Sequence, residues 1–168
     1  NRSIVPTRLL KKPVFVDLLS NGNAINNSSV VVRTTLIRQI NGFSEDRELV
    51  GSEDFDGWIR LSKLTDKFDR IDLVLGYYWN ASGNLTSAYT TLTNNIFLKF
   101  RYRKELHDIF GQALPGWMLY SSARASLALR EFSAGKKDAL LAINAKLPYI
   151  LKIKAIIIWF LSLIKYRV

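Results

Sequence analysis

The pattern of apolar and polar positions predicts short strands as well as helices in the first half of the chain. Val30–Val32 is a β-branched run, which is typical of a short buried strand. Between Arg70 and Trp79, Ile71, Leu73 and Leu75 occupy alternate positions, and this alternation predicts a second strand. These two segments are the basis for expecting a β component in the fold.

Three helical segments are also expected in this half. A short helical turn is predicted around Val14–Leu19, and Thr34 or Thr35 can cap a second short helix over Leu36–Ile40. The third helix is predicted from Ser52 to about Leu64, because its apolar residues recur at three- and four-residue intervals. Ser52 is expected to cap this helix.

After Leu85 no strand pattern remains, and the spacing predicts helices only. They are expected over residues 87–110, 115–133, 136–146 and 149–166, punctuated by Gly111, Pro115, Gly135 and Pro148. This change from a mixed pattern of strands and helices to a purely helical one predicts two domains. The first comprises residues 1–86, and the second is a helical, basic subdomain at residues 87–168.

Composition and charge add two limits. The chain has 168 residues, no cysteine and a net charge of +10, so thiolate metal sites and disulfides are excluded and a reducing compartment fits. The charge is concentrated in residues 85–168, which carry 13 Lys or Arg and 4 Asp or Glu. The first residue is Asn1 and the only methionine is Met118, which favours a fragment of a longer protein.

The start of the helix at Ser52 holds the candidate chemistry. Glu53, Asp54 and Asp56 lie within its first turn. Acids at a helix start are stabilised by the macrodipole by about 0.3–1 kcal/mol, so a purely structural role is one interpretation. The other is that Asp54 acts as a general base that accepts a proton from a sugar hydroxyl.

Four motifs follow one another across about residues 22–87. They are Asn27-Ser28-Ser29-Val30-Val31-Val32-Arg33, Asn41-Gly42-Phe43-Ser44-Glu45, Glu53-Asp54-Phe55-Asp56-Gly57-Trp58-Ile59-Arg60-Leu61 and Tyr77-Tyr78-Trp79. In order, spacing and residue type this series resembles the motifs of family 2 glycosyltransferases. The resemblance implies an α/β fold: the acceptor-side part of a GT-A, Rossmann-like domain, followed by an all-helical C-terminal extension.

The function implied by the resemblance is inverting sugar transfer from a nucleotide sugar to a glycan or lipid-linked acceptor. Asp54 matches the family's catalytic base, and Glu53 is expected to orient the site or bond the acceptor. Trp58, Arg33 and Asn27 are the expected acceptor-binding residues. Core packing is the favoured alternative for Trp58, because Ile59 beside it is also apolar.

The cofactor implied for the full-length enzyme is Mg²⁺ or Mn²⁺, with none bound by this chain. The family's upstream metal-binding and nucleobase-binding aspartates are absent here. The loop after Tyr78 reads Trp79-Asn80-Ala81-Ser82-Gly83, without the arginine and histidine that many members have there. The parent is therefore expected to be active, and this part alone inactive.

The last predicted helix suggests a membrane partner. Its uncharged stretch, Ala155–Ile164, is too short to span a bilayer but suits a helix lying in an anionic membrane interface, with Trp159 at the boundary. A buried core helix is the alternative. We therefore expect a cytoplasmic protein, peripheral at the inner membrane face.

The competing function is a non-catalytic basic helical module that binds membrane or protein. Nucleic-acid binding is not expected, although residues 99–104 interleave aromatic and basic side chains. On a helix this alternation scatters the residues around the axis.

Overall fold

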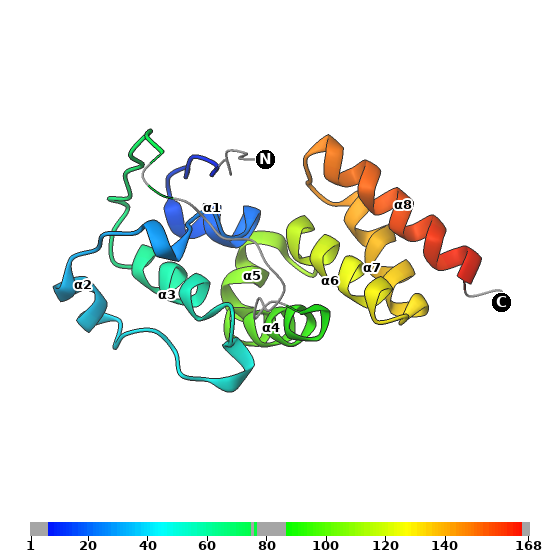
Figure 1. Cartoon of the computed structure of the whole chain (residues 1–168), viewed down its shortest axis with the longest axis horizontal. Helices are drawn as coiled ribbons and strands as arrows, with labels where there is room; N and C mark the ends of the chain where they lie inside the picture. Colours follow the sequence, from blue (N-terminus) through cyan, green and yellow to red (C-terminus); the bar gives the residue numbers. More distant parts are fainter. Residues whose placement is uncertain (1–6, 75, 77–86, 166–168) are drawn as a thin grey trace.

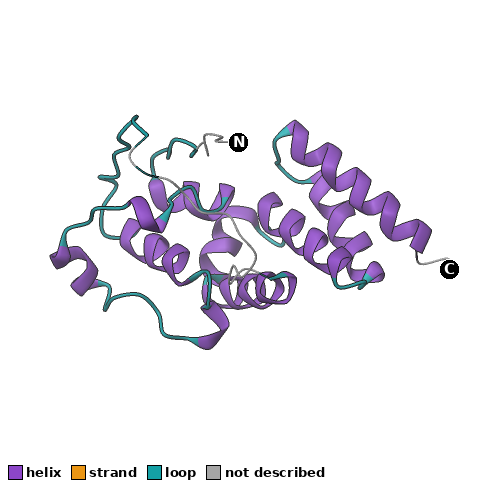
Figure 2. Cartoon of the chain, viewed as in Figure 1, coloured by secondary structure: helices purple, strands orange, loops and turns teal. Residues whose placement is uncertain are grey.

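The computed structural model describes residues 7–74, 76 and 87–165, and in them the chain is helical (Figures 1 and 2). The α-helices in these residues are α1 (Val14–Asn21), α2 (Thr34–Gln39), α3 (Glu53–Ser62), α4 (Ala88–Arg101), α5 (Arg103–Phe110), α6 (Gly116–Ala128), α7 (Phe132–Asn144) and α8 (Tyr149–Lys165). Two single 3₁₀ turns, η1 (Asn27–Ser29) and η2 (Arg47–Leu49), lie in the loops between them.

The predicted α/β fold is wrong, since the described residues contain no strand. The Val30–Val32 run forms no strand, and Val31 is 100% exposed. Of the second predicted strand, residues 70–74 are irregular and expose Ile71 and Leu73, while Leu75 and residues 77–79 lie outside the described residues. A strand needs a neighbouring strand to satisfy its backbone groups, and the described residues provide none.

The predicted helices are confirmed with adjusted ends, except that Gly135, expected as a break between two of them, lies inside α7. The helix expected over residues 87–110 is two helices, because the backbone at Tyr102 (φ −105°, ψ 23°) separates α4 from α5. Ser87 caps α4, with its hydroxyl accepting a hydrogen bond from the Thr90 N–H at 3.0 Å. Gly111, with φ +63°, ends α5 in a conformation that favours glycine.

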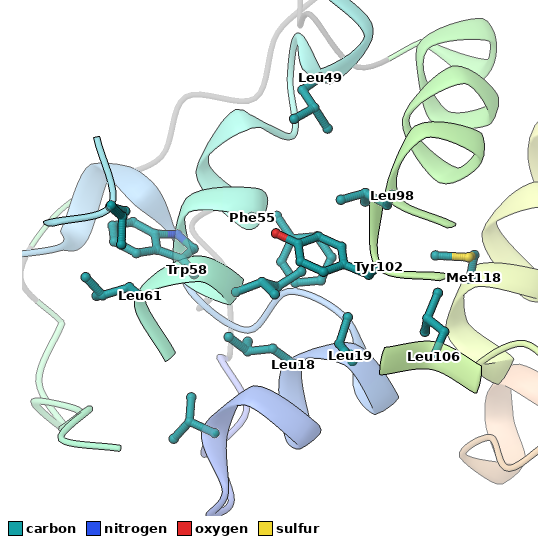
Figure 3. Packing of buried hydrophobic residues seen from close by; sticks show 13 residues of the cluster. Leu18, Leu19, Leu49, Phe55, Trp58, Leu61, Leu98, Tyr102, Leu106 and Met118 are labelled. Carbon is teal, nitrogen blue, oxygen red and sulfur yellow. The ribbon is translucent and has the colours of Figure 1, made fainter. Parts of the chain in front are cut away.

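A single main core joins α1, α3, α4, α5 and the start of α6. We use the name "main core" for this cluster of buried residues, which consists of Val14, Leu18, Leu19, Ile40, Leu49, Phe55, Trp58, Ile59, Leu61, Leu98, Tyr102, Leu106 and Met118. Figure 3 shows Phe55 of α3 and Leu98 of α4 among the side chains of this cluster, together with Tyr102. These residues come from both sides of the predicted domain boundary at 86/87, so α4 and α5 pack with the first half of the chain.

The C-terminal helices pack differently, with small residues along their contacts. Here α7 packs against both α6 and α8. Two small clusters lie between these helices, and we name them the alanine seams. One consists of Leu119, Ala142 and Ala155, and the other of Ala123, Ala139 and Ile158. A Cβ at Gly116 would lie 2.7 Å from the Lys146 carbonyl oxygen, so only glycine permits this close approach.

Candidate functional site

The first turn of α3 places three carboxylates in three different environments. Glu53 is half-buried, and its Oε2 accepts a hydrogen bond from the Gly51 N–H at 2.7 Å. This contact holds the loop that leads into α3. Glu53 therefore has a local structural role in addition to any part in binding.

Asp54 is half-buried and takes part in no ion pair within the described residues. Its Oδ1 accepts a hydrogen bond from the Phe55 N–H at 2.6 Å. Burial raises the pKa of the Asp54 carboxyl above its ordinary value, and the negative charge of Glu53 adds to the rise, while the backbone hydrogen bonds oppose it. Among the described residues, Asp54 is thus a carboxylate with no cationic partner and with increased basicity.

Asp56 is fully buried and is the centre of an ion-pair network. Its Oδ2 accepts a hydrogen bond from Arg60 Nε at 2.7 Å, and Arg101 Nε lies 3.2 Å from its Oδ1. The Tyr102 hydroxyl donates to the same Oδ1 at 2.7 Å. Burial raises the pKa of Tyr102, and this hydrogen bond and the Asp56 charge raise it further. Asp56 therefore fastens α3 to the junction of α4 and α5.

Arg60 serves the same network. In addition to its ion pair with Asp56, its guanidinium donates to the carbonyl oxygen of Ile40. Arg60 is therefore engaged by a buried carboxylate and by a backbone carbonyl of the same region.

Trp58 lies in the main core and is only 1% exposed. Its ring meets that of Phe43 edge-on, with the ring centroids 5.4 Å apart. Phe43 also covers Gly57, where a Cβ would come within 2.5 Å of the Phe43 ring. The Gly42-Phe43 motif and the Gly57-Trp58 motif, distant in sequence, are therefore packed together. In this arrangement Trp58 has the packing role that the sequence favoured.

Arg33 and Asn27 are exposed and lie in the segment around η1 and α2. No hydrogen bond or ion pair between described residues joins either side chain to α3. The structure thus brings Glu53, Asp54 and Trp58 together on one helix but does not bring Arg33 or Asn27 into contact with them.

Two open hollows flank this helix. One, of about 160 Å³, is lined by Ser44, Glu45, Asp46, Val50, Gly51 and Glu53. The other, of about 410 Å³, is lined by Ile40, Asn41, Phe43, Ser44, Glu45, Arg60 and Arg101. Asp54, the candidate base, lines neither hollow. Of the residues of α3, Glu53 lines the first hollow and Arg60 lines the second.

The acids of α3 do not fit a metal site. Asp54 and Asp56 have the Asp-x-Asp spacing, but the oxygens of Asp56 are already engaged by Arg60, Arg101 and Tyr102. Within residues 7–74, 76 and 87–165, no three His, Cys, Asp or Glu side chains are grouped so as to hold an ion. The Mg²⁺ or Mn²⁺ implied by the resemblance has no site among these residues.

Residues of α4 that the sequence did not single out support the first turn of α3. Ser52 precedes α3 as expected, but its hydroxyl makes no capping bond and instead accepts a hydrogen bond from Asn94 Nδ2 at 2.8 Å. Asn94 also donates to the Val50 carbonyl at 3.3 Å. Asn94 and Arg101 are polar residues in an amphipathic helix, and nothing in their local pattern indicates partners about forty residues away.

Comparison with protein-family models, with curated proteins and with solved structures finds no match to this chain.

Proposed function

We propose that this chain carries the acceptor side of a sugar-transfer site, in which Asp54 is the general base. The acceptor is a hydroxyl of a glycan or a lipid-linked sugar, and the donor is a nucleotide sugar held by residues outside this chain. The observation that supports the proposal most is the half-buried Asp54 carboxylate, which has no cationic partner in the described residues and sits within the Glu53–Leu61 motif.

In the proposed reaction Asp54 accepts the proton of the acceptor hydroxyl as the hydroxyl oxygen attacks the anomeric carbon. The bond from that carbon to the nucleotide diphosphate breaks, and the configuration inverts. An ordinary aspartate is a weak base near neutral pH. Burial, which raises the pKa of Asp54, increases its basicity in the direction that general-base catalysis needs.

The other residues have supporting roles in this proposal. Glu53 positions the loop at Gly51 through its hydrogen bond and can also contact the acceptor. Trp58 supports Asp54 by packing the helix against the main core rather than by stacking on the acceptor. Arg33 and Asn27, exposed beside α2, would contact only a more distant part of the acceptor.

The proposed location is the cytoplasm, at the inner face of a membrane. The absence of cysteine agrees with a reducing compartment. A lipid-linked acceptor would present its sugar at the membrane surface.

The test is sugar transfer by the protein at its full natural length, measured as nucleotide diphosphate released from a panel of UDP-, GDP- and dTDP-sugars. Asp54→Asn should lower kcat by about 10²–10⁴ and leave donor binding unchanged, since only the proton acceptor is lost. Asp138→Asn is the matched control, because Asp138 on α7 is also a half-buried aspartate whose pKa is raised by burial.

Two results would contradict the proposal. One is retention of more than half of kcat by Asp54→Asn. The other is the absence of transfer from every donor tested, which would favour the alternative function of a non-catalytic basic helical module.

A further inference from the structure

The last helix, α8, buries only one narrow side. Ala155, Ile158 and Ser162 are at most 6% exposed and lie three or four residues apart, so they form one stripe of the helix. This stripe packs on α7 and, over a smaller part, on α6. In Figure 1, α8 is the outermost helix at this end of the molecule.

The opposite side of α8 is apolar and uncovered. We call outer face the stripe formed by Tyr149, Ile150, Ile153, Ile156, Ile157, Phe160, Leu161 and Ile164, each between 40% and 80% exposed. At about 100° per residue these positions form one continuous band along the helix. A contiguous apolar surface of this kind marks a binding site rather than ordinary scatter.

The charged residues of α8 itself are all positive. By the same helical spacing, Lys152 and Lys154 lie on opposite edges of the band. Residues 139–168 contain five Lys or Arg and no Asp or Glu. An apolar band with cationic edges is complementary to a surface whose interior is apolar and whose rim is anionic, which describes a bilayer containing acidic lipids.

We propose that α8 lies flat in the headgroup region of an anionic membrane, with its outer face toward the acyl chains and Lys152 and Lys154 at the phosphates. Its 17 residues span about 25 Å, shorter than the hydrocarbon core of about 30 Å. Among the described residues, no helix is both long enough and apolar enough to cross a membrane. The proposal goes beyond sugar transfer and does not depend on it.

Trp159 does not take part in the inserted surface. It is half-buried and packs against the alanine seam of Ala123, Ala139 and Ile158. The sequence placed Trp159 at the membrane boundary, but the packing of α8 turns it toward α6 and α7. A reporter of insertion must therefore be placed on the outer face itself.

The first experiment is sedimentation of the whole chain with vesicles of phosphatidylcholine, with and without phosphatidylglycerol. The chain should bind only the vesicles that contain phosphatidylglycerol, and binding should weaken as salt shortens the screening length. Ile157→Glu should weaken binding at least about tenfold, which is the effect of losing one buried isoleucine side chain. Ile96→Glu is the matched control, because Ile96 is also an exposed isoleucine but lies on α4.

The cationic edges are tested separately. Lys152→Gln and Lys154→Gln should each weaken binding about fivefold, the effect of one cation near an anionic surface. Lys11→Gln, in the exposed loop before α1, should leave binding nearly unchanged.

Insertion is measured with an environment-sensitive fluorophore on Ile157→Cys, which is the only thiol because the chain has no cysteine. Its emission should shift to the blue on binding, whereas the same label on Ser133→Cys, exposed on α7, should not respond.

Three outcomes would overturn the proposal. The first is that the chain does not bind vesicles that contain phosphatidylglycerol. The second is that the Ile157→Glu variant binds these vesicles as well as the Ile96→Glu variant does. The third is a concentration-dependent dimer in lipid-free buffer that Ile157→Glu abolishes, which would assign the outer face to a second copy of the chain.

Discussion

The main core and the alanine seams hold helices together in opposite ways. The main core fills wide spaces between α1, α3, α4 and α5 with large side chains such as Trp58 and Phe55. The seams bring α6, α7 and α8 close together through Ala139, Ala142 and Ala155, each 0% exposed. The main core should therefore be destabilised by substitutions that remove side-chain volume, and the alanine seams by substitutions that add it.

The largest effect is expected from Trp58→Ala. Deleting a fully buried tryptophan should lower the free energy of unfolding by about 3–5 kcal/mol, because it removes apolar contact and leaves a cavity. Urea denaturation followed by circular dichroism measures the change. Phe100→Ala, which truncates an exposed aromatic of α4, should change stability by less than about 0.5 kcal/mol. Unchanged stability of Trp58→Ala with weaker acceptor binding would instead make Trp58 an acceptor contact.

Asp56→Ala tests the polar part of the main core. This substitution removes the shared partner of Arg60 and Arg101. We expect the free energy of unfolding to fall by about 3 kcal/mol. This is the lower end of the range for a broken buried ion pair, because both arginines are partly exposed. The comparison is Glu105→Ala, which breaks the exposed pair with Lys63 and should cost less than about 1 kcal/mol. Equal losses in urea denaturation would show that the buried network adds no stability of its own.

Ala139→Leu tests the seams. Adding side-chain volume at this fully buried position should lower the free energy of unfolding by about 1–3 kcal/mol. The reason is that α7 cannot move away from both α6 and α8 without losing other contacts. Ala134→Leu, at an exposed position of the same helix, is the control and should be neutral. If the two variants melt at the same temperature, the seams are loosely packed.

The smallest effect concerns Asp54 and depends on pH. Because burial raises the pKa of Asp54 in the folded state, its contribution to stability is present below the unfolded pKa and is lost as pH rises through the folded pKa. Asp54→Asn cannot ionise, so it should be more stable than wild type at neutral pH. The difference should vanish below the ordinary aspartate pKa of about 3.9.

Asp138→Asn should follow the same pH trend, since burial raises the pKa of Asp138 too. Thermal melts across this pH range make the comparison. A less stable Asp54→Asn variant at neutral pH would mean that the Asp54 charge mainly stabilises the start of α3 through the helix dipole.

The local sequence predicted the helices well because their signals are local. The apolar spacing of α3 and the breaks at Gly111 and Pro148 depend on residues within one or two turns. The same reasoning failed for Val30–Val32 and residues 70–74. An alternating or β-branched run favours a strand only when another strand can pair with it, and no such partner is described.

The sequence by itself determined which helices form and that the first turn of α3 is rich in acid. Only the tertiary structure separated those acids, since Asp56 is engaged by Arg101 and Tyr102 while Asp54 is left without an ion pair among the described residues. It also decided which side of α8 stays open. The physical reason is that helix formation follows from neighbours in sequence, whereas burial and ion pairing follow from residues that are distant in sequence and brought together by packing.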